Sequence, residues 1–393
     1  MTIGLDELDY LSTAAGARLL AQLSTEDLSD ANTLRLLTSL RRDLPAAVAG
    51  AALEMARLRS AAVGKFGADA GRMFFTRAAL EQASDPLVRR YRAGSVGAGP
   101  QLQMTDVCCG IGSDALAFAA AGASVHGIDH DPVGVAIAAH NAAALGLSVT
   151  FEVADAHTIT PQGDLLFYDP ARRDSEGRRI HHVARYLPPL SLLRGWVVPQ
   201  RLAKLSPGVD LAQLDEYGGA VEFISANGDL KEALLRLDAN AAGAGQRRAT
   251  LLTESATYHW QRDDRSAPAA PITAPRGWLV EPDPALIRAG LVADAAVAFG
   301  GALLDETIAY FTTDADPSSP WARAWPIEAW LPFNLKALRA YLRARDVGQV
   351  TVKKRGTAVT PDVLIQKLKL KGSDHRVVIL TRNRGQQIVL ICN

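Results

Sequence analysis

The chain has 393 residues, of which 48% are hydrophobic and 21% charged, and its 42 Lys and Arg balance its 42 Asp and Glu. This composition excludes a disordered protein, and the length predicts two or three domains. With no apolar run long enough to span a membrane, an acidic rather than basic start, and only three cysteines, we expect a cytoplasmic enzyme.

The first 75 residues predict a helical domain. Leucines recur at helical spacing between residues 19 and 40, and an Ala/Leu-rich segment at 46–63 follows Pro45. Its role stays open between a lid and a substrate platform.

From residue 102 onward, short apolar runs alternate with helix-length segments. Strands are expected at 102–110, 124–131, 149–155, 164–170, 201–207, 220–225 and 248–254, and helices at 113–123, 132–146 and 190–198. This alternation predicts an α/β fold with a mostly parallel sheet and helices on both faces. Ligands of such sheets bind beyond the carboxyl ends of the strands.

The first of these strands ends in a glycine-rich turn, Asp106-Val-Cys-Cys-Gly110-Ile-Gly112. Glycines let the backbone approach a ligand closely, and the N-terminus of the next helix donates N–H groups. With Ala115 the turn also fits the dinucleotide pattern G-x-G-x-x-A, so a nicotinamide-dependent oxidoreductase is an alternative. Cys108 and Cys109 are interpreted as small packing residues rather than nucleophiles.

The next two strands end in acids. A carboxylate at Asp129 can accept hydrogen bonds from both ribose hydroxyls, and Asp155 with the backbone N–H of Ala156 can bind an adenine edge. Each acid alone is more often a loop residue or a helix cap. Their recurrence at successive strand ends indicates a bound nucleoside.

The fourth strand ends in Tyr168-Asp169-Pro170-Ala171-Arg172-Arg173, and at this point a family resemblance emerges. Residues 106–170 resemble a class I S-adenosylmethionine-dependent methyltransferase. The run DVCCGIGSDALAFAAAGASVHGIDHDPVGVAIAAHNA is similar to the trimethylguanosine synthase branch of RNA methyltransferases.

Further segments resemble bacterial methyltransferases with a C-terminal THUMP-like domain, THUMP domains being RNA-binding units. These segments are MFFTRAALEQA, YDPARRD, WLVEPDPALIRAGLV and LPFNLKALRAYLRARDVGQVTVKKRG. The resemblance implies a Rossmann-like class I fold with a mostly parallel seven-stranded sheet. We therefore expect a helical N-terminal domain at 1–75, a methyltransferase domain at 76–265, a Pro-rich linker at 266–275 and an α+β THUMP-like domain at 276–393.

S-adenosylmethionine is the cofactor that the resemblance implies. It assigns the methionine part to the turn, the ribose to Asp129 and the adenine to Asp155. Phe74-Phe75-Thr76 resembles a short segment that packs over the methionine end, which adds Thr76. The turn residues concerned are Asp106, Cys108, Gly110 and Gly112.

Catalysis is predicted at the end of the fourth strand. The Asp169 side chain and the Pro170 carbonyl would accept the two hydrogens of an amine and aim its lone pair at the methyl group. Methyltransferases of this type usually place Pro and an aromatic residue where Ala171 and Arg172 stand. Tyr168 should point to the opposite face of the sheet. N-methylation of a base in tRNA or rRNA is expected, with a non-catalytic RNA-binding module as the alternative.

The last 60 residues carry thirteen basic and three acidic side chains, a net charge of +10. Such a bias predicts a polyanion partner, although solvated charges are the commoner explanation. Lys367, Lys369 and Lys371 alternate as on one face of a strand, whereas on a helix they would spread. The predicted RNA contacts are Arg172, Arg173, Lys353, Lys354 and Arg355.

The arginines after the fourth strand have a second interpretation, in which they pair with Asp174 and Glu176 in an exposed loop. His181 and His182 lack a further ligand at metal-binding spacing. No membrane, metal or obligate protein partner is therefore predicted.

Overall fold

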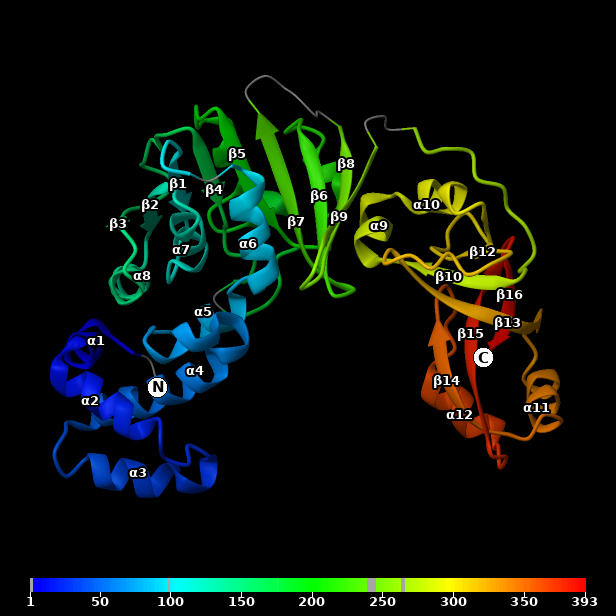
Figure 1. The fold of residues 1–393 in the computed structure, drawn as a ribbon, viewed down its shortest axis with the longest axis horizontal. Helices are drawn as coiled ribbons and strands as arrows, with labels where there is room; N and C mark the ends of the chain where they lie inside the picture. Colours follow the sequence, from blue (N-terminus) through cyan, green and yellow to red (C-terminus); the bar gives the residue numbers. More distant parts are fainter. Residues whose placement is uncertain (1–2, 98, 175, 239–244, 263–265) are drawn as a thin grey trace. The chain divides into compact units, whose positions relative to one another are not determined.

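The computed structural model describes the chain except residues 1–2, 98, 175, 239–244 and 263–265 (Figure 1). Two compact units emerge. One comprises Met1–Ala226, Lys231–Ala244 and Leu252–Ala256, and the other Asn227–Leu230, Gly245–Leu251 and Thr257–Asn393. The expected division at 1–75, 76–265 and 276–393 stays a prediction, and its residues 1–2, 98, 175, 239–244 and 263–265 lie outside the described part.

Helices occupy the N-terminal region as predicted. Thr13 begins the second of them by accepting the N–H of Gly16 at 3.1 Å, and Asp85 and Pro86 begin the sixth. The helices are α1 (Leu5–Ser12), α2 (Ala14–Leu23), α3 (Thr33–Leu40), α4 (Ala46–Phe66), α5 (Arg77–Gln82) and α6 (Pro86–Ser95).

A large sheet follows, with the strand order β3-β2-β1-β4-β5-β7-β6-β8-β9. The first five are parallel neighbours, and β7 pairs antiparallel with β5. The α/β fold is confirmed, and within the described residues this sheet has nine strands where seven were expected. They are β1 (Gln103–Val107), β2 (Ser124–Asp129), β3 (Val149–Val153), β4 (Leu165–Tyr168), β5 (Gln200–Leu205), β6 (Ala220–Ala226), β7 (Asp229–Asp238), β8 (Arg247–Leu252) and β9 (Thr257–Arg262).

Alternating strand residues cover the two faces of this sheet. Leu165 and Phe167 pack against α6 and against α7 (Ser113–Ala120), which follows β1. Tyr168, on the other face, contacts Trp196 in a region of short 3₁₀ turns. Helix α8 (Pro132–Leu145) follows β2, and the helix expected at 190–198 is a 3₁₀ turn at Leu190–Arg194.

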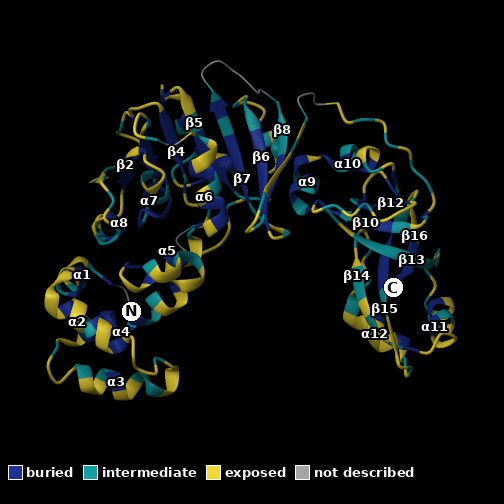
Figure 2. Ribbon diagram, viewed as in Figure 1, coloured by how far each residue is buried: buried dark blue, intermediate teal, exposed yellow. Residues whose placement is uncertain are grey.

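The N-terminal helices share a hydrophobic core with the segment around the glycine turn. Leu11 and Met55 from these helices belong to the same buried cluster as Ile111, Leu116 and Ile137. Figure 2 shows buried residues along α4 and α7. The helical region is thus packed directly beside the candidate site.

The second unit contains a seven-stranded sheet with the order β11-β12-β10-β13-β16-β15-β14. Two helices cover one of its faces through Leu338, Leu342, Leu364 and Leu368. Its strands are β10 (Trp278–Pro282), β11 (Ala302–Leu303), β12 (Phe311–Thr313), β13 (Ala322–Pro332), β14 (Val347–Lys354), β15 (Asp374–Asn383) and β16 (Gln386–Cys392). Its helices are α9 (Pro284–Ala289), α10 (Val292–Ala298), α11 (Leu335–Arg343) and α12 (Pro361–Leu368).

The alternating lysines near residue 369 do not lie on a strand. Lys367 belongs to the last turn of α12, and Lys369 ends that helix with a φ of 48°. Apolar Leu364 and Leu368 are the buried positions of this segment, so helical periodicity decides its structure.

Candidate functional site

Four acidic residues meet at one edge of the large sheet. Because β1, β2, β3 and β4 are parallel, their carboxyl ends lie at the same edge. Asp129 ends β2, and Asp155 and Asp169 follow β3 and β4, while Asp106 is the penultimate residue of β1. The topology therefore brings together the acids predicted from the sequence.

The glycine turn leaves room for a ligand beside its backbone. Gly110 and Gly112 have φ angles of 53° and 79°, which favour glycine. A Cβ on Gly110 would meet no atom within 4 Å, whereas one on Gly112 would lie 3.1 Å from the Cβ of Ala138. Gly112 thus permits packing against α8, and Gly110 presents an open backbone at the start of α7.

Cys108 and Cys109 hold the turn through their backbones. Both N–H groups donate to the carbonyl of Ile128, at 2.8 and 3.1 Å. Burial raises the pKa of both thiols well above the usual range, with nearby carboxylates adding to it. They remain protonated at neutral pH, which agrees with packing rather than nucleophilic roles.

Asp129 links the second strand to the turn. Its Oδ2 accepts the N–H of Gly110 at 2.8 Å, and its Oδ1 accepts the N–H of Asp131 at 2.9 Å. Oδ1 also lies 3.1 Å from Nδ1 of His130. Because each carboxylate oxygen can accept more than one hydrogen bond, Oδ2 keeps capacity for a ribose hydroxyl. The carboxylate is thereby oriented at the sheet edge before any ligand binds.

Asp155 and Ala156 offer the two groups expected for an adenine edge. Asp155 is exposed, and its Oδ1 accepts the N–H of His157 at 2.9 Å, which lowers its pKa. Within the described part of the chain, the N–H of Ala156 has no hydrogen-bond partner. A carboxylate and a free N–H thus stand on consecutive residues.

The segment containing Thr76 lies against the glycine turn. Asn141 of α8, fully buried, accepts the N–H of Phe74 at 2.7 Å and donates to the carbonyls of Phe74 and Ile111 at 3.1 and 3.3 Å. Ile111 stands between the two glycines of the turn. Thr76 itself accepts the N–H of Ala79 at 3.2 Å and starts α5. Asn141 was not predicted from the sequence.

A buried lysine holds the candidate catalytic acid. Lys204, near the end of β5, places its Nζ 2.5 Å from Oδ2 of Asp169, and the lysine side chain is only 5% exposed. The other oxygen, Oδ1, lies 4.0 Å from Arg172. A buried ammonium needs such a partner. The only signal in the sequence was one lysine within the apolar strand RLAKLSP.

Asp106 presents the opposite case, a buried carboxyl with no partner. It is 1% exposed, and neither oxygen accepts a hydrogen bond from the described residues. Burial raises its pKa well above the usual range, and the neighbouring Asp114 and Asp169 raise it further. An orphaned carboxyl beside the glycine turn suits a cationic or hydrogen-bonding ligand group.

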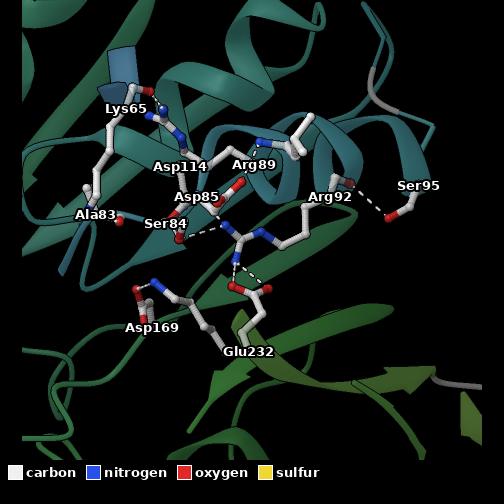
Figure 3. A network of polar contacts seen from close by, with 12 residues as sticks. Lys65, Ala83, Ser84, Asp85, Arg89, Arg92, Ser95, Asp114, Asp169 and Glu232 are labelled. Atoms are coloured by element: carbon white, nitrogen blue, oxygen red, sulfur yellow. Dashed lines mark hydrogen bonds and ion pairs between the residues drawn. The ribbon is translucent and has the colours of Figure 1, made fainter. Parts of the chain in front are cut away.

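Charged residues behind the edge form a buried network (Figure 3). Arg92 of α6, which is fully buried, contacts Asp114 of α7, Glu232 of β7 at 3.0 Å and Ser84 at 3.1 Å. Although burial opposes it, attraction to the two carboxylates raises the pKa of Arg92. The network ties two helices to the strand beside β5.

Tyr168 points away from the candidate site, as expected. Its hydroxyl donates to the carbonyl of Pro188 at 2.8 Å, and its ring meets Trp196 edge-on. After buried Pro170, Ala171 pairs with Leu187 through two backbone hydrogen bonds. No aromatic residue therefore stands at the two positions that follow Asp169-Pro170.

The predicted RNA contacts fall in two places. Arg172 is half-buried beside Asp169, and Arg173 is exposed and donates to the carbonyl of Gly177 at 2.8 Å. In the other unit, Lys353 and Arg355 both pair with Glu281, at 3.1 and 3.2 Å, and Lys354 is exposed. The residues predicted to bind the cofactor and the acceptor lie at one sheet edge, whereas Lys353 of β14 and Arg355, which follows β14, are neutralised by Glu281.

Among the described residues, no cluster of His, Cys, Asp or Glu could hold a metal ion. In the same part of the chain, no helix has the length and apolar character needed to cross a membrane.

Three family models match the chain. A methyltransferase domain covers residues 104–168, a THUMP domain-like region covers 322–393, and a domain of unknown function (DUF8688) covers 4–62. The methyltransferase match spans β1 to β4, and with them Asp106 and Asp129.

Two named relatives are similar over most of the chain. An uncharacterized S-adenosylmethionine-dependent methyltransferase in two strains of Mycobacterium tuberculosis is 35% identical over 339 residues, which is 84% of this chain and 92% of the relative. The crystal structure of a proposed methyltransferase from Porphyromonas gingivalis W83 shares the fold, with a TM-score of 0.78 and 21% identity. That alignment covers 100% of this chain and 99% of the other.

Proposed function

The chain belongs to the S-adenosylmethionine-dependent methyltransferases, and from that premise we propose that it methylates a base nitrogen in tRNA or rRNA. The observation that carries the proposal is Asp169, held by Lys204 at the same sheet edge as the cofactor acids. The THUMP-like region and its basic charge support RNA as the substrate. We also propose that the protein acts in the cytoplasm, where tRNA and rRNA are found.

The residues around the glycine turn fit this cofactor. Gly110 offers open backbone to the methionine part, Asp129 offers acceptors to the ribose, and Asp155 with Ala156 offers an acceptor and a donor to the adenine. Thr76, Asp106, Cys108 and Gly112 complete the proposed binding set. When bound, the cofactor supplies a methyl group already activated by a sulfonium.

The protein's main task is then to position the acceptor. Lys204 occupies Oδ2 of Asp169, which leaves Oδ1 and the Pro170 carbonyl to accept the two hydrogens of an amine. Both acceptors fix the direction of the nitrogen lone pair. Alignment of two bound reactants can supply about 7–11 kcal/mol of the barrier reduction. Because Ala171 and Arg172 replace an aromatic platform, Arg172 and Arg173 are proposed to bind phosphates near the base.

Transfer of a labelled methyl group tests this function. Total RNA from a strain lacking the gene is incubated with the protein and tritiated S-adenosylmethionine, and the labelled nucleoside is identified by mass spectrometry. We expect an N-methylated base with the wild type and none with the double variant Asp169→Ala/Lys204→Met, which avoids leaving the buried ammonium unpaired. Label in protein or small molecules but not in RNA would contradict the proposal.

Lys204 provides a second prediction. Lys204→Met removes the ion pair at similar volume and frees the Asp169 carboxylate to move, so we expect kcat to fall about 10- to 100-fold. Lys204→Arg keeps the charge and should retain more activity than Lys204→Met. Binding of S-adenosylhomocysteine, measured by calorimetry, should be unchanged in both variants. Wild-type kcat in Lys204→Met would exclude a positioning role.

A further inference from the structure

The second unit carries a group of cations that its own acids do not neutralise. Three lie on α11 and three at the end of α12 and beyond it (Figure 1). We refer to this group as the α11–α12 basic patch, and its members are Lys336, Arg339, Arg343, Lys367, Lys369 and Lys371.

Hydrogen bonds bring the two halves of the patch together. Lys336, Arg339 and Arg343 share one side of α11 at a spacing of three and four residues. Arg339 donates to the carbonyl of Lys367, and Arg343 donates to the carbonyl of Lys369 at 2.8 Å. The two arginines thereby provide hydrogen-bond donors for backbone carbonyls at the end of α12, which brings them close to the lysines of that segment.

Elsewhere in this unit, acids hold cations in pairs. Glu328 binds Arg345 at 2.8 Å and Arg376 at 2.7 Å, and Glu281 likewise binds two cations of β14 and its following turn. Within the described residues, none of the six patch side chains forms an ion pair with a carboxylate. Asp346, the acid between α11 and β14, accepts the hydroxyl of Ser373 instead.

Six like charges on one surface repel one another, and a polyanion relieves that repulsion while releasing counterions. Solvent alone can screen such charges, and two of the arginines also have a structural role at the end of α12. Five of the six are nevertheless exposed, and in Figure 2 both helices include residues coloured as exposed.

Among the described residues of this unit, the aromatic side chains are not placed to stack bases at the patch. The ring of Tyr341 of α11 packs against Arg345, and its centroid lies 3.6 Å from the guanidinium carbon. Trp330 is exposed on β13, but its neighbours Ala329 and Leu331 pack in the α11–α12 core, which places the tryptophan on the other face. Cations without stacking platforms suit the phosphate backbone of a duplex better than unpaired bases.

We propose that the α11–α12 basic patch binds the sugar-phosphate backbone of double-helical RNA. The inference rests on the proposed function and specifies the substrate: a folded RNA, held by a helical stem. The proposal also assigns RNA binding in this unit to the patch instead of Lys353 and Arg355, whose charges Glu281 neutralises.

A charge-matched pair of variants tests the proposal in the full-length protein. The patch variant is Lys367→Gln/Lys369→Gln/Lys371→Gln. The control, Arg18→Gln/Arg41→Gln/Arg42→Gln, removes three exposed charges from the N-terminal helical region. A fluorescein-labelled RNA hairpin with a 16-base-pair stem is titrated by anisotropy at several salt concentrations.

We expect the patch variant to bind the hairpin at least about tenfold more weakly, with the slope of log K against log salt reduced by about two to three. The control variant should bind like the wild type. Binding of S-adenosylhomocysteine, equal in all three proteins, shows that they are folded.

Other outcomes overturn the proposal. Equal hairpin binding by the patch variant and the wild type would show that the patch does not bind RNA, and it would not contradict the proposed RNA methylation. Tighter binding of a single strand than of the hairpin would reject duplex recognition. Patch-dependent sedimentation with phosphatidylserine vesicles, but not patch-dependent hairpin binding, would assign the surface to a membrane. A wild type that binds no RNA would overturn the proposed function as well.

Discussion

At the scale of single residues, the candidate site contains one acid in an ion pair and one buried acid without a hydrogen-bond partner among the described residues. Asp169 has Lys204, whereas buried Asp106 has no partner among the described residues. A carboxyl group without a partner is costly to ionise in the interior, so it titrates at higher pH in the folded chain than in the unfolded one.

This difference makes stability depend on pH in a defined direction. The unfolded carboxyl of Asp106 titrates near 3.8, and the folded one well above that. Between these two values the folded state binds more protons, so stability falls as pH rises, by about 1.4 kcal/mol for each unit of pKa difference. Asp106→Asn removes this contribution. In urea unfolding, the variant should gain stability relative to the wild type from pH 5 to pH 8.

Two controls accompany the measurement. The cost of burying the new amide is independent of pH, so only the change between the two pH values is diagnostic. Asp43→Asn, which removes an exposed acid between α3 and α4, is the control for the loss of one negative charge. If the free energy of unfolding varied with pH in the same way for Asp106→Asn and the wild type, ionisation of Asp106 would cost the folded state little free energy.

At the scale of elements, the Arg92 network joins α6 and α7 to β7 behind the sheet edge. Arg92→Met leaves the carboxylates of Asp114 and Glu232 buried without their cation. We expect a loss of about 3–5 kcal/mol in the free energy of unfolding, measured by urea denaturation.

The triple variant Arg92→Met/Asp114→Asn/Glu232→Gln removes all three charges and should recover most of this loss. A triple variant as unstable as Arg92→Met would show that the hydrogen-bond geometry of the network, rather than its charge balance, stabilises these elements.

The sequence predicted the elements whose pattern is local. Strands β1 to β4 are short apolar runs that end in glycine or acid, and each was expected. Strand β7 was not, because its residues Glu232 to Arg236 include strong helix formers. Its position between β5 and β6, where Ala233, Leu234 and Leu235 are buried, overrides that preference.

The residues of the candidate site also divide into those that a local sequence pattern predicts and those that depend on the tertiary fold. Acids at strand ends follow from topology and could be predicted, although their ligand contacts stay predictions. Lys204, Asn141 and Arg92 could not, because each has a partner that is distant in the chain, at separations of 35, 67 and 140 residues respectively. Only the tertiary fold distinguishes a lysine that holds an acid from one that is solvated.

At the scale of the whole molecule, each compact unit has hydrophobic cores of its own. Buried clusters around Met55 and Phe167 belong to the first unit, and clusters around Leu338 and Leu279 to the second. The residues proposed for the cofactor all lie in the first unit. A ligand that binds there stabilises only the unit that holds its site, if each unit unfolds by itself.

Scanning calorimetry with S-adenosylhomocysteine tests this independence. At 100 times its Kd the ligand adds about 2.7 kcal/mol, which should raise one transition by about 5–10 °C and leave the other in place. Asp129→Ala removes the proposed ribose acceptor, and this shift should then disappear at the same ligand concentration. One transition for the entire chain would show that the units unfold together. A shift confined to the THUMP-like transition would instead place the cofactor outside the sheet edge that Asp129 and Asp155 share.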